Sequence, residues 1–172
     1  RFGGARMVRN LYPTSEASTS MGTTGAVINA ASGITWPVGI TSNGFEIVED
    51  TSTGNHYAGR SATLTVGLLQ QISVYAKQKT AGRYLQLAGA GLGGVSECPV
   101  FDLGNGTVDV PATTTVCKSA AIESIGFGIY RCSALIYPTS EVLAFGITND
   151  ASNNALASYA GSAGSGVYIN GI

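Results

Sequence analysis

The sequence has little charge, and neither sign of charge dominates. Charged residues make up 11% of the 172 residues, and the formal net charge is −1. Proteins whose main partner is a nucleic acid carry a surplus of Lys and Arg, so this composition argues against that function. With so few charges, Ser, Thr, Asn and Gly must cover most of the surface.

Long apolar runs and helical periodicity are also lacking. No run approaches the ~20 apolar residues that a membrane-spanning helix needs. The start of the chain has no charged-then-apolar leader. No window of about 11–18 residues sustains the 3.6-residue period of an amphipathic helix. We therefore expect no membrane partner and no substantial helix.

Glycine, in contrast, is abundant, with 24 residues. This composition suits short strands joined by tight turns, because glycine adopts the positive φ angles that such turns need. The sequence predicts an all-β fold of about ten antiparallel strands, arranged as a sandwich or a barrel. We expect residues 11–172 to form this single domain and residues 1–10 to be an N-terminal arm or linker.

The clearest strand pattern lies between Ser61 and Leu87. Apolar and polar residues alternate in Ser61–Val66 and in Ile72–Lys77, and a third run follows at Arg83–Leu87. Strict alternation is typical of a strand with one buried face. We expect these strands to lie close together with a common polar face. The candidate contact residues on that face are Tyr75, Lys77, Tyr84 and Gln86.

Further strands are predicted along the rest of the chain. Val100–Leu103 and Thr107–Val110 flank Gly104-Asn105-Gly106, which is typical of a hairpin with a three-residue turn. The other expected strands are Asn43–Val48, 112–122, Ile125–Ile136, Val142–Ile147 and Gly166–Ile172. Polar loops are expected at Glu49–Tyr57 and at Asn149–Gly166.

Residues with catalytic or metal-binding chemistry are few and scattered. The single histidine, His56, is interpreted as a surface residue, and no nucleophile-elbow motif accompanies it. Cysteine and histidine lack the spacing of a zinc site. We therefore predict no enzymatic activity and no metal-ligand set. A structural calcium ion is the one cofactor considered, held by Glu49-Asp50 or by Asn149-Asp150.

Three cysteines are present, so at least one is a free thiol or is bonded to another chain. Cys98 and Cys117 flank the predicted hairpin, and whether they form a disulfide is left open. Cys132 falls on the apolar side of its predicted strand and is interpreted as a small buried residue.

The order of motifs resembles a known family. The motifs are NLYPTSE at 10–16, the strands within 61–87, FDLGNGTV at 101–108, GIYRCS at 128–133 and GVYINGI at 166–172. Together they are similar to the carbohydrate-binding-module-like jelly-roll domain of bacteriophage structural proteins, including head spike or fibre proteins and tail-associated proteins. The resemblance extends over nearly the whole chain and implies that the fold is a jelly-roll-like antiparallel β-sandwich without substantial helix.

The chain departs from the pattern of this family at tryptophan positions. Ile129 stands where the family usually has Trp, and Trp36 lies further along than the Trp that often follows the opening motif. If the family's Trp forms a sugar platform, its displacement weakens the expectation of a sugar site like the family's.

The resemblance implies a non-enzymatic structural or adhesion domain of a phage virion, such as a head spike, fibre or decoration protein that aids attachment to the host surface. It also implies assembly in the host cytoplasm, location on the virion surface, capsid or tail proteins as partners, and a homo-oligomer, for which a trimer is one form. The alternative is a carbohydrate-binding module of a larger secreted or cell-surface protein. A depolymerase or glycosidase is the third interpretation.

The candidate binding residues are shared by the two leading interpretations. Trp36 and the tyrosines Tyr75 and Tyr84 could stack on sugar rings or could anchor a protein interface. Arg1, Arg6 and Arg9 make the arm locally basic, so it is either a solvated linker or an anchor that docks on an acidic neighbour.

Overall fold

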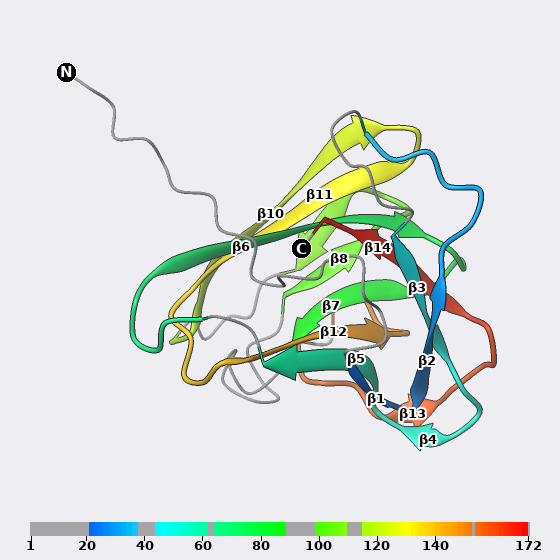
Figure 1. The fold of residues 1–172 in the computed structure, drawn as a ribbon, viewed down its shortest axis with the longest axis horizontal. Helices are drawn as coiled ribbons and strands as arrows, with labels where there is room; N and C mark the ends of the chain where they lie inside the picture. The colour runs from blue at the N-terminus through cyan, green and yellow to red at the C-terminus, as the bar shows by residue number, and fades with distance from the viewer. Residues whose placement is uncertain are drawn as a thin grey trace.

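Two antiparallel sheets pack face to face in the computed structural model, which describes residues 21–37, 44–61, 64–88, 99–109, 115–152 and 154–171 (Figure 1). Its strands in chain order are β1 (Gly22–Thr24), β2 (Ala26–Ala30), β3 (Phe45–Glu49), β4 (Thr53–Gly54), β5 (His56–Ser61), β6 (Gln70–Gln78), β7 (Tyr84–Ala88), β8 (Val100–Asp102), β9 (Thr107–Asp109), β10 (Cys117–Gly126), β11 (Ile129–Ile136), β12 (Val142–Thr148), β13 (Tyr159–Ala160) and β14 (Gly166–Asn170). No helix occurs among these residues.

Each of the two large sheets has six strands. The first has the order β1-β5-β12-β7-β8-β9, and the second has the order β10-β11-β6-β14-β3-β2. Strands β13 and β4 form a separate two-stranded sheet. All pairings among the described strands are antiparallel.

The core lies between the two large sheets, because each contributes an alternating set of apolar side chains. Ile72, Val74 and Ala76 of β6 and Val167 and Ile169 of β14 are buried on the inner face of the second sheet. The first sheet supplies a matching set, which consists of Leu85, Leu87, Phe101, Leu143, Phe145 and Ile147. These side chains form one continuous cluster. The period-2 pattern of the sequence is therefore the direct cause of the sandwich.

The fold class and most of the predicted strands are confirmed. The chain is all-β and forms an antiparallel sandwich, and the hairpin pairs Phe101 with Val108 across β8 and β9. Strands β6, β7, β12 and β14 lie within two residues of their predicted positions. The jelly-roll order of the strands stays a prediction.

Four local predictions are wrong. The loop predicted at Asn149–Gly166 contains β13 and the first residue of β14. Leu64–Val66 does not continue a strand: β5 ends at Ser61, and the Leu68 amide donates to the Thr65 carbonyl in a turn. Leu64 is nevertheless buried in the core, so the apolar alternation arises from a loop residue that packs inward. The polar loop predicted at Glu49–Tyr57 contains β4 and the start of β5. The run Ile125–Ile136 is split at a turn into the ends of β10 and β11.

Several predictions concern residues outside the described ranges. They are the N-terminal arm with Arg1, Arg6 and Arg9, and Cys98 with its bond to Cys117. These stay predictions.

A substitution at Gly166 tests how closely β14 approaches β3 in the second sheet. A Cβ at this position would overlap the Ile47 carbonyl oxygen and would lie 2.9 Å from the Val48 Cα. Because these are backbone atoms of β3, they cannot rotate away. We expect Gly166→Ala to lower the free energy of unfolding by about 1–3 kcal/mol, the usual cost of overpacking.

Gly22→Ala is the matched control, measured in the same urea titrations. Its Cβ would meet the Gly59 carbonyl oxygen at 3.8 Å, an ordinary contact. We expect a change within about 0.5 kcal/mol. Equal stabilities of the two variants would contradict the close approach of β14 to β3.

Candidate functional site

The sandwich divides the candidate contact residues between two outer faces. Tyr75 and Lys77 alternate with the inward-facing residues of β6, and Tyr84 and Gln86 alternate with those of β7. Strands β6 and β7 belong to different sheets, so their outer faces point away from each other. The prediction of a common polar face is therefore wrong. Sequence alternation shows which residues share a face of a strand, but it does not show which strands share a sheet.

Gln86 is unavailable to a partner. It is wholly buried, and its Nε2 donates to the Ala155 carbonyl oxygen at 2.9 Å. On the same face, Leu156 packs over Ala88 and Ala144. The segment that carries Ala155 and Leu156 therefore covers this part of the first sheet. Gln86 was predicted to contact a partner, but its hydrogen bond holds a loop of its own chain against the sheet.

The outer face of the second sheet carries a group of half-buried polar and aromatic side chains. Lys77 of β6 pairs with Tyr168 of β14, and Tyr75 pairs with Arg131 of β11 on its other side. Tyr75 and Tyr168 are therefore diagonal neighbours across adjacent strands, about 7–8 Å apart. All four side chains are half-buried. We call Tyr75, Lys77, Arg131 and Tyr168 the tyrosine face.

Charged groups surround the tyrosine face in pairs. Glu123 lies opposite Arg131 in the β10–β11 register. Glu46 lies opposite Tyr168, forms an ion pair with Lys79 at 3.0 Å and accepts a hydrogen bond from Asn29. The surface around the tyrosines therefore carries both acidic and basic side chains.

Trp36 lies near this face but is packed. Its side chain is 9% exposed, and Gly44 approaches both the Trp36 ring and the Asn170 side chain. Asn170 pairs with Tyr75 across β14 and β6. Trp36 and Asn170 thus lie on either side of Gly44, and Trp36 has little ring surface open to a ligand.

A second cluster, which the sequence interpretation missed, surrounds the buried carboxylate of Glu49. Arg83 donates to both carboxylate oxygens, through Nε to Oε1 and through an amino group to Oε2 at 3.2 Å. The Tyr159 hydroxyl donates to Oε1 at 2.6 Å, and the Ser162 amide donates to Oε2 at 2.7 Å. The side chain of Glu49 has no exposed area, so this set of donors is what stabilises its charge.

The pKa values of this cluster follow from its contacts. Burial raises the pKa of Tyr159 well above its usual range, and its hydrogen bond to Glu49 adds to the shift. The hydrogen bonds to Glu49 raise the pKa of Arg83. The guanidinium also lies over the Tyr159 ring, 5.6 Å from its centroid. Tyr159 and Arg83 are thus held in their protonated forms, as expected of side chains with a structural role.

His56 is buried in the same region, and its interpretation as a surface residue is wrong. Its Nδ1 contacts the Gly25 carbonyl oxygen, its Nε2 lies 3.2 Å from the Tyr159 carbonyl oxygen, and its ring stacks at a tilt on Tyr159. The polar sequence around His56 suggested a loop. The exposed residues of the preceding turn are polar, so the composition of this stretch did not indicate that β5 begins at His56.

The two calcium candidates have identifiable contacts, and the calcium ion stays a prediction. Glu49 is committed to Arg83. Asp50 accepts from the Ser52 amide and Asp150 accepts from Ser152, and these hydrogen bonds lower the pKa values of both aspartates. In the described part of the chain, no three His, Cys, Asp or Glu residues come together as a metal site would need.

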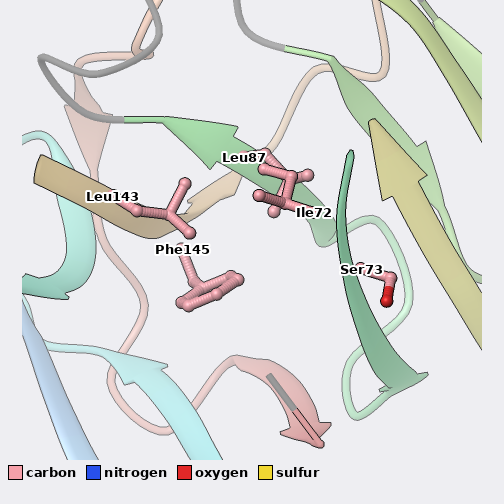
Figure 2. Close-up of a pocket in the computed structure, with 5 residues that line it drawn as sticks. All are labelled: Ile72, Ser73, Leu87, Leu143 and Phe145. Carbon is pink, nitrogen blue, oxygen red and sulfur yellow. The ribbon is translucent and has the colours of Figure 1, made fainter. Parts of the chain in front are cut away.

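The crevice between the sheets is too small for a ligand. It is lined by Ile72, Ser73, Leu87, Leu143 and Phe145, and it has no interior space for a water molecule. Figure 2 shows the Leu87, Leu143 and Phe145 side chains opposite Ile72, with the Ser73 hydroxyl pointing away from them. Cys132 lies in the same core, where burial raises the pKa of its thiol and makes it a poor nucleophile.

Comparisons with known proteins give no further identification. The chain matches no protein-family model and no curated protein sequence. Within the described residues, no helix is long and apolar enough to cross a membrane.

The ion pair of Glu49 should dominate local stability. We expect Glu49→Gln to lower the free energy of unfolding toward the lower end of about 3–5 kcal/mol, because it removes one partner of a buried pair while Arg83 keeps some access to water. Glu46→Gln, which breaks the more exposed pair with Lys79, should cost about 0–1 kcal/mol. Urea denaturation measures both, and equal costs would contradict the difference in burial.

The raised pKa of Tyr159 predicts a loss of stability in alkali. The unfolded chain releases this phenolic proton near pH 10 and the folded chain does so only at higher pH, so stability falls as pH rises above about 10. Tyr159→Phe lacks this proton. We expect its deficit in unfolding free energy relative to the wild type to shrink between pH 9 and pH 11, with Tyr84→Phe as the control. A deficit that does not change with pH would contradict the prediction.

Proposed function

We propose that this chain is a non-enzymatic structural and adhesion domain on the surface of a phage virion, and that it contacts its partner through the tyrosine face. The ordered resemblance of its motifs to phage structural domains supports the setting. The observation that carries the binding role is the placement of Tyr75 and Tyr168 as half-buried neighbours, with Lys77 and Arg131 beside them.

This arrangement has the features of a recognition surface. Tyrosine offers a rigid apolar ring with a polar end, and Tyr and Arg are enriched at the energetic centres of interfaces. Lys77 is already positioned, since its Nζ donates to the Phe127 carbonyl oxygen at 3.0 Å. Side chains that are held before binding lose less entropy when a partner arrives.

The groups with catalytic potential support a binding role instead of catalysis. Glu49, His56 and Tyr159 are engaged with one another or with backbone atoms of loops, and Glu49 and His56 are fully buried. A general base must reach a substrate proton. These residues face other strands of the same chain.

The alternative function is that of a carbohydrate-binding module. The specific observation in its favour is the same pair of tyrosines on adjacent strands, whose rings could stack on successive sugar faces while Lys77 and Arg131 donate to hydroxyls. Both functions depend on the tyrosine face, but their partners differ.

Binding by variants of the domain separates these functions. We expect Tyr75→Ala to weaken attachment of the purified domain to its partner at least tenfold, because a central tyrosine is lost. Tyr84→Ala is the matched control, since it removes a half-buried tyrosine from the opposite outer face, and should change binding less than twofold. Partners to be tested are particles of the phage that encodes the chain and an array of bacterial surface glycans.

The pattern of binding decides between the outcomes. Immunogold labelling at symmetry-related sites on intact particles, with no glycan bound, supports the virion function. Glycan binding that Tyr75→Ala abolishes, without particle labelling, supports the alternative. If Tyr75→Ala binds both partners as the wild type does, the tyrosine face is not the contact surface. Release of reducing ends from host polysaccharide would overturn the non-enzymatic assignment.

A further inference from the structure

The turn of the β8–β9 hairpin contains an Asn-Gly step, Asn105-Gly106. In such a step the backbone nitrogen of the glycine can attack the side-chain carbonyl carbon of the asparagine, because glycine has no side chain to hinder the approach. A new C–N bond forms to the glycine nitrogen, whose proton passes through water to the side-chain nitrogen, and that nitrogen leaves as ammonia. Water then opens the resulting succinimide ring to aspartate or isoaspartate. The reaction needs no enzyme.

Asp102 holds both nitrogen atoms that take part in this reaction. The Gly106 amide, which is the nucleophile, donates to the Asp102 carbonyl oxygen at 2.8 Å. The Asn105 Nδ2, which is the leaving group, donates to the Asp102 Oδ2 at 2.8 Å. The Oδ1 of the same carboxylate accepts from the Gly104 amide at 2.8 Å and from the Asn105 amide at 3.0 Å. The closed turn therefore opposes the approach of nitrogen to carbon that ring closure requires.

Contacts with the second sheet also restrict the turn. A Cβ added at Gly104 would lie 3.1 Å from the Gln78 Nε2, and one added at Gly106 would lie 3.0 Å from the Tyr130 ring. The turn thus packs closely on β6 and β11. Asn105 itself is exposed, so water reaches its side chain. Protection of this residue comes from the geometry of the turn and not from burial.

Strand β9 is the part of this hairpin that can open most readily. It has three residues and lies at the edge of the first sheet, and among the described strands it pairs only with β8. Thr107 is exposed, and Val108 and Asp109 are only half-buried. Segments with few buried side chains open at a lower free energy than the core does. When the hairpin opens, Gly106 and the Asn105 side chain are released from Asp102.

We propose that Asn105 is a site of spontaneous deamidation, and that the reaction takes place when the β8–β9 hairpin opens. The products cannot restore the original turn. Aspartate at position 105 places a second carboxylate where the Nδ2 donor faced Asp102, and like charges at this distance repel each other. Isoaspartate adds a carbon atom to the backbone of the turn. The modification goes beyond the proposed function, since it involves no residue of the tyrosine face.

A second Asn-Gly step provides an internal reference. Asn170, the last residue of β14, has no exposed area, and the Gly171 amide donates to the Asn170 Oδ1 at 2.7 Å. Strand β14 lies between β6 and β3 in the second sheet, so we expect this step to react only after global unfolding. A third step, Asn43-Gly44, begins outside the described residues.

Peptide mapping of the full chain by mass spectrometry tests the proposal. The chain is incubated in mildly alkaline buffer, folded or unfolded in urea, and the replacement of the side-chain NH₂ by OH is followed at each Asn-Gly step. We expect Asn105 to react at least about tenfold more slowly in the folded chain than in urea, because the reaction waits for the hairpin to open. Asn170, relative to its own rate in urea, should be slowed further.

Two variants separate the effect of Asp102 from that of charge. Asp102→Asn keeps an oxygen that can accept from the backbone of the turn but loses the acceptor for the Asn105 Nδ2. We expect it to speed deamidation of the folded chain about tenfold, the effect of losing one hydrogen bond to a charged group. Asp109→Asn is the matched control, because it removes the same charge from β9, and it should react at the wild-type rate. Circular dichroism shows whether both variants are folded.

Hydrogen exchange of the wild type gives a second measurement that needs no variant. The free energy of opening at the Gly106 amide should account for the slowing of deamidation at Asn105 to within about tenfold. The proposal is overturned if Asn105 reacts equally fast in the folded chain and in urea, or if Asn170 reacts in the folded chain while Asn105 stays intact. Equal rates for folded Asp102→Asn and Asp109→Asn would also contradict it.

Discussion

The buried carboxylate of Glu49 is the interaction on which one end of the sandwich depends. Glu49 ends β3 in the second sheet, and Arg83, its ion-pair partner, immediately precedes β7 in the first. The same carboxylate accepts from Tyr159 and Ser162, which lie in the long connection between β12 and β14. A charge without contact with water is tolerated only where donors surround it. The two sheets and this connection must therefore come together at the same point.

The backbone around Glu49 reinforces this requirement. Its amide donates to the Ser165 carbonyl oxygen, and its carbonyl oxygen accepts from the Gly164 amide. His56 continues the cluster by contacting Gly25 and Tyr159, which ties β2 and β13 to the start of β5. Hydrophobic burial in the core does not select one loop path over another. Hydrogen bonds to one buried anion do select a loop path, because each donor has to reach an oxygen atom at a fixed position.

The predictable part of this protein is the part governed by local alternation. Strands β6, β7, β12 and β14 follow from a period of two, because one face of each lies in the core. The Glu49 cluster could not be found in this way, because its members are separated by up to 113 residues and each occurs in a polar stretch typical of a loop. Buried polar residues are rare, so a sequence pattern assigns Glu49 and His56 to the surface by default.

The sequence predicted which face of its strand a residue occupies, but it did not predict which sheet the strand belongs to. Tyr75 and Tyr84 are both outward-facing, as their alternation with apolar neighbours requires. They point in opposite directions because the chain crosses from one sheet to the other between β6 and β7. A short connection favours neighbouring strands of one sheet, but here the chain crosses to the other sheet, and Arg83, the last residue before β7, pairs with Glu49 of β3 in the second sheet.

The same constraint indicates where recognition can take place. The charged and titratable side chains around Glu49 hold one end of the sandwich together, and apolar side chains fill the space between the sheets. The crevice lined by Ile72, Leu87 and Phe145 has no space for a ligand, so the contact that we propose uses an outer face instead. The tyrosine face lies on β6, β11 and β14, away from the Glu49 cluster, and its Lys77 is held by a hydrogen bond to the Phe127 carbonyl oxygen. The residues that stabilise the fold and the residues proposed to make a contact are therefore different.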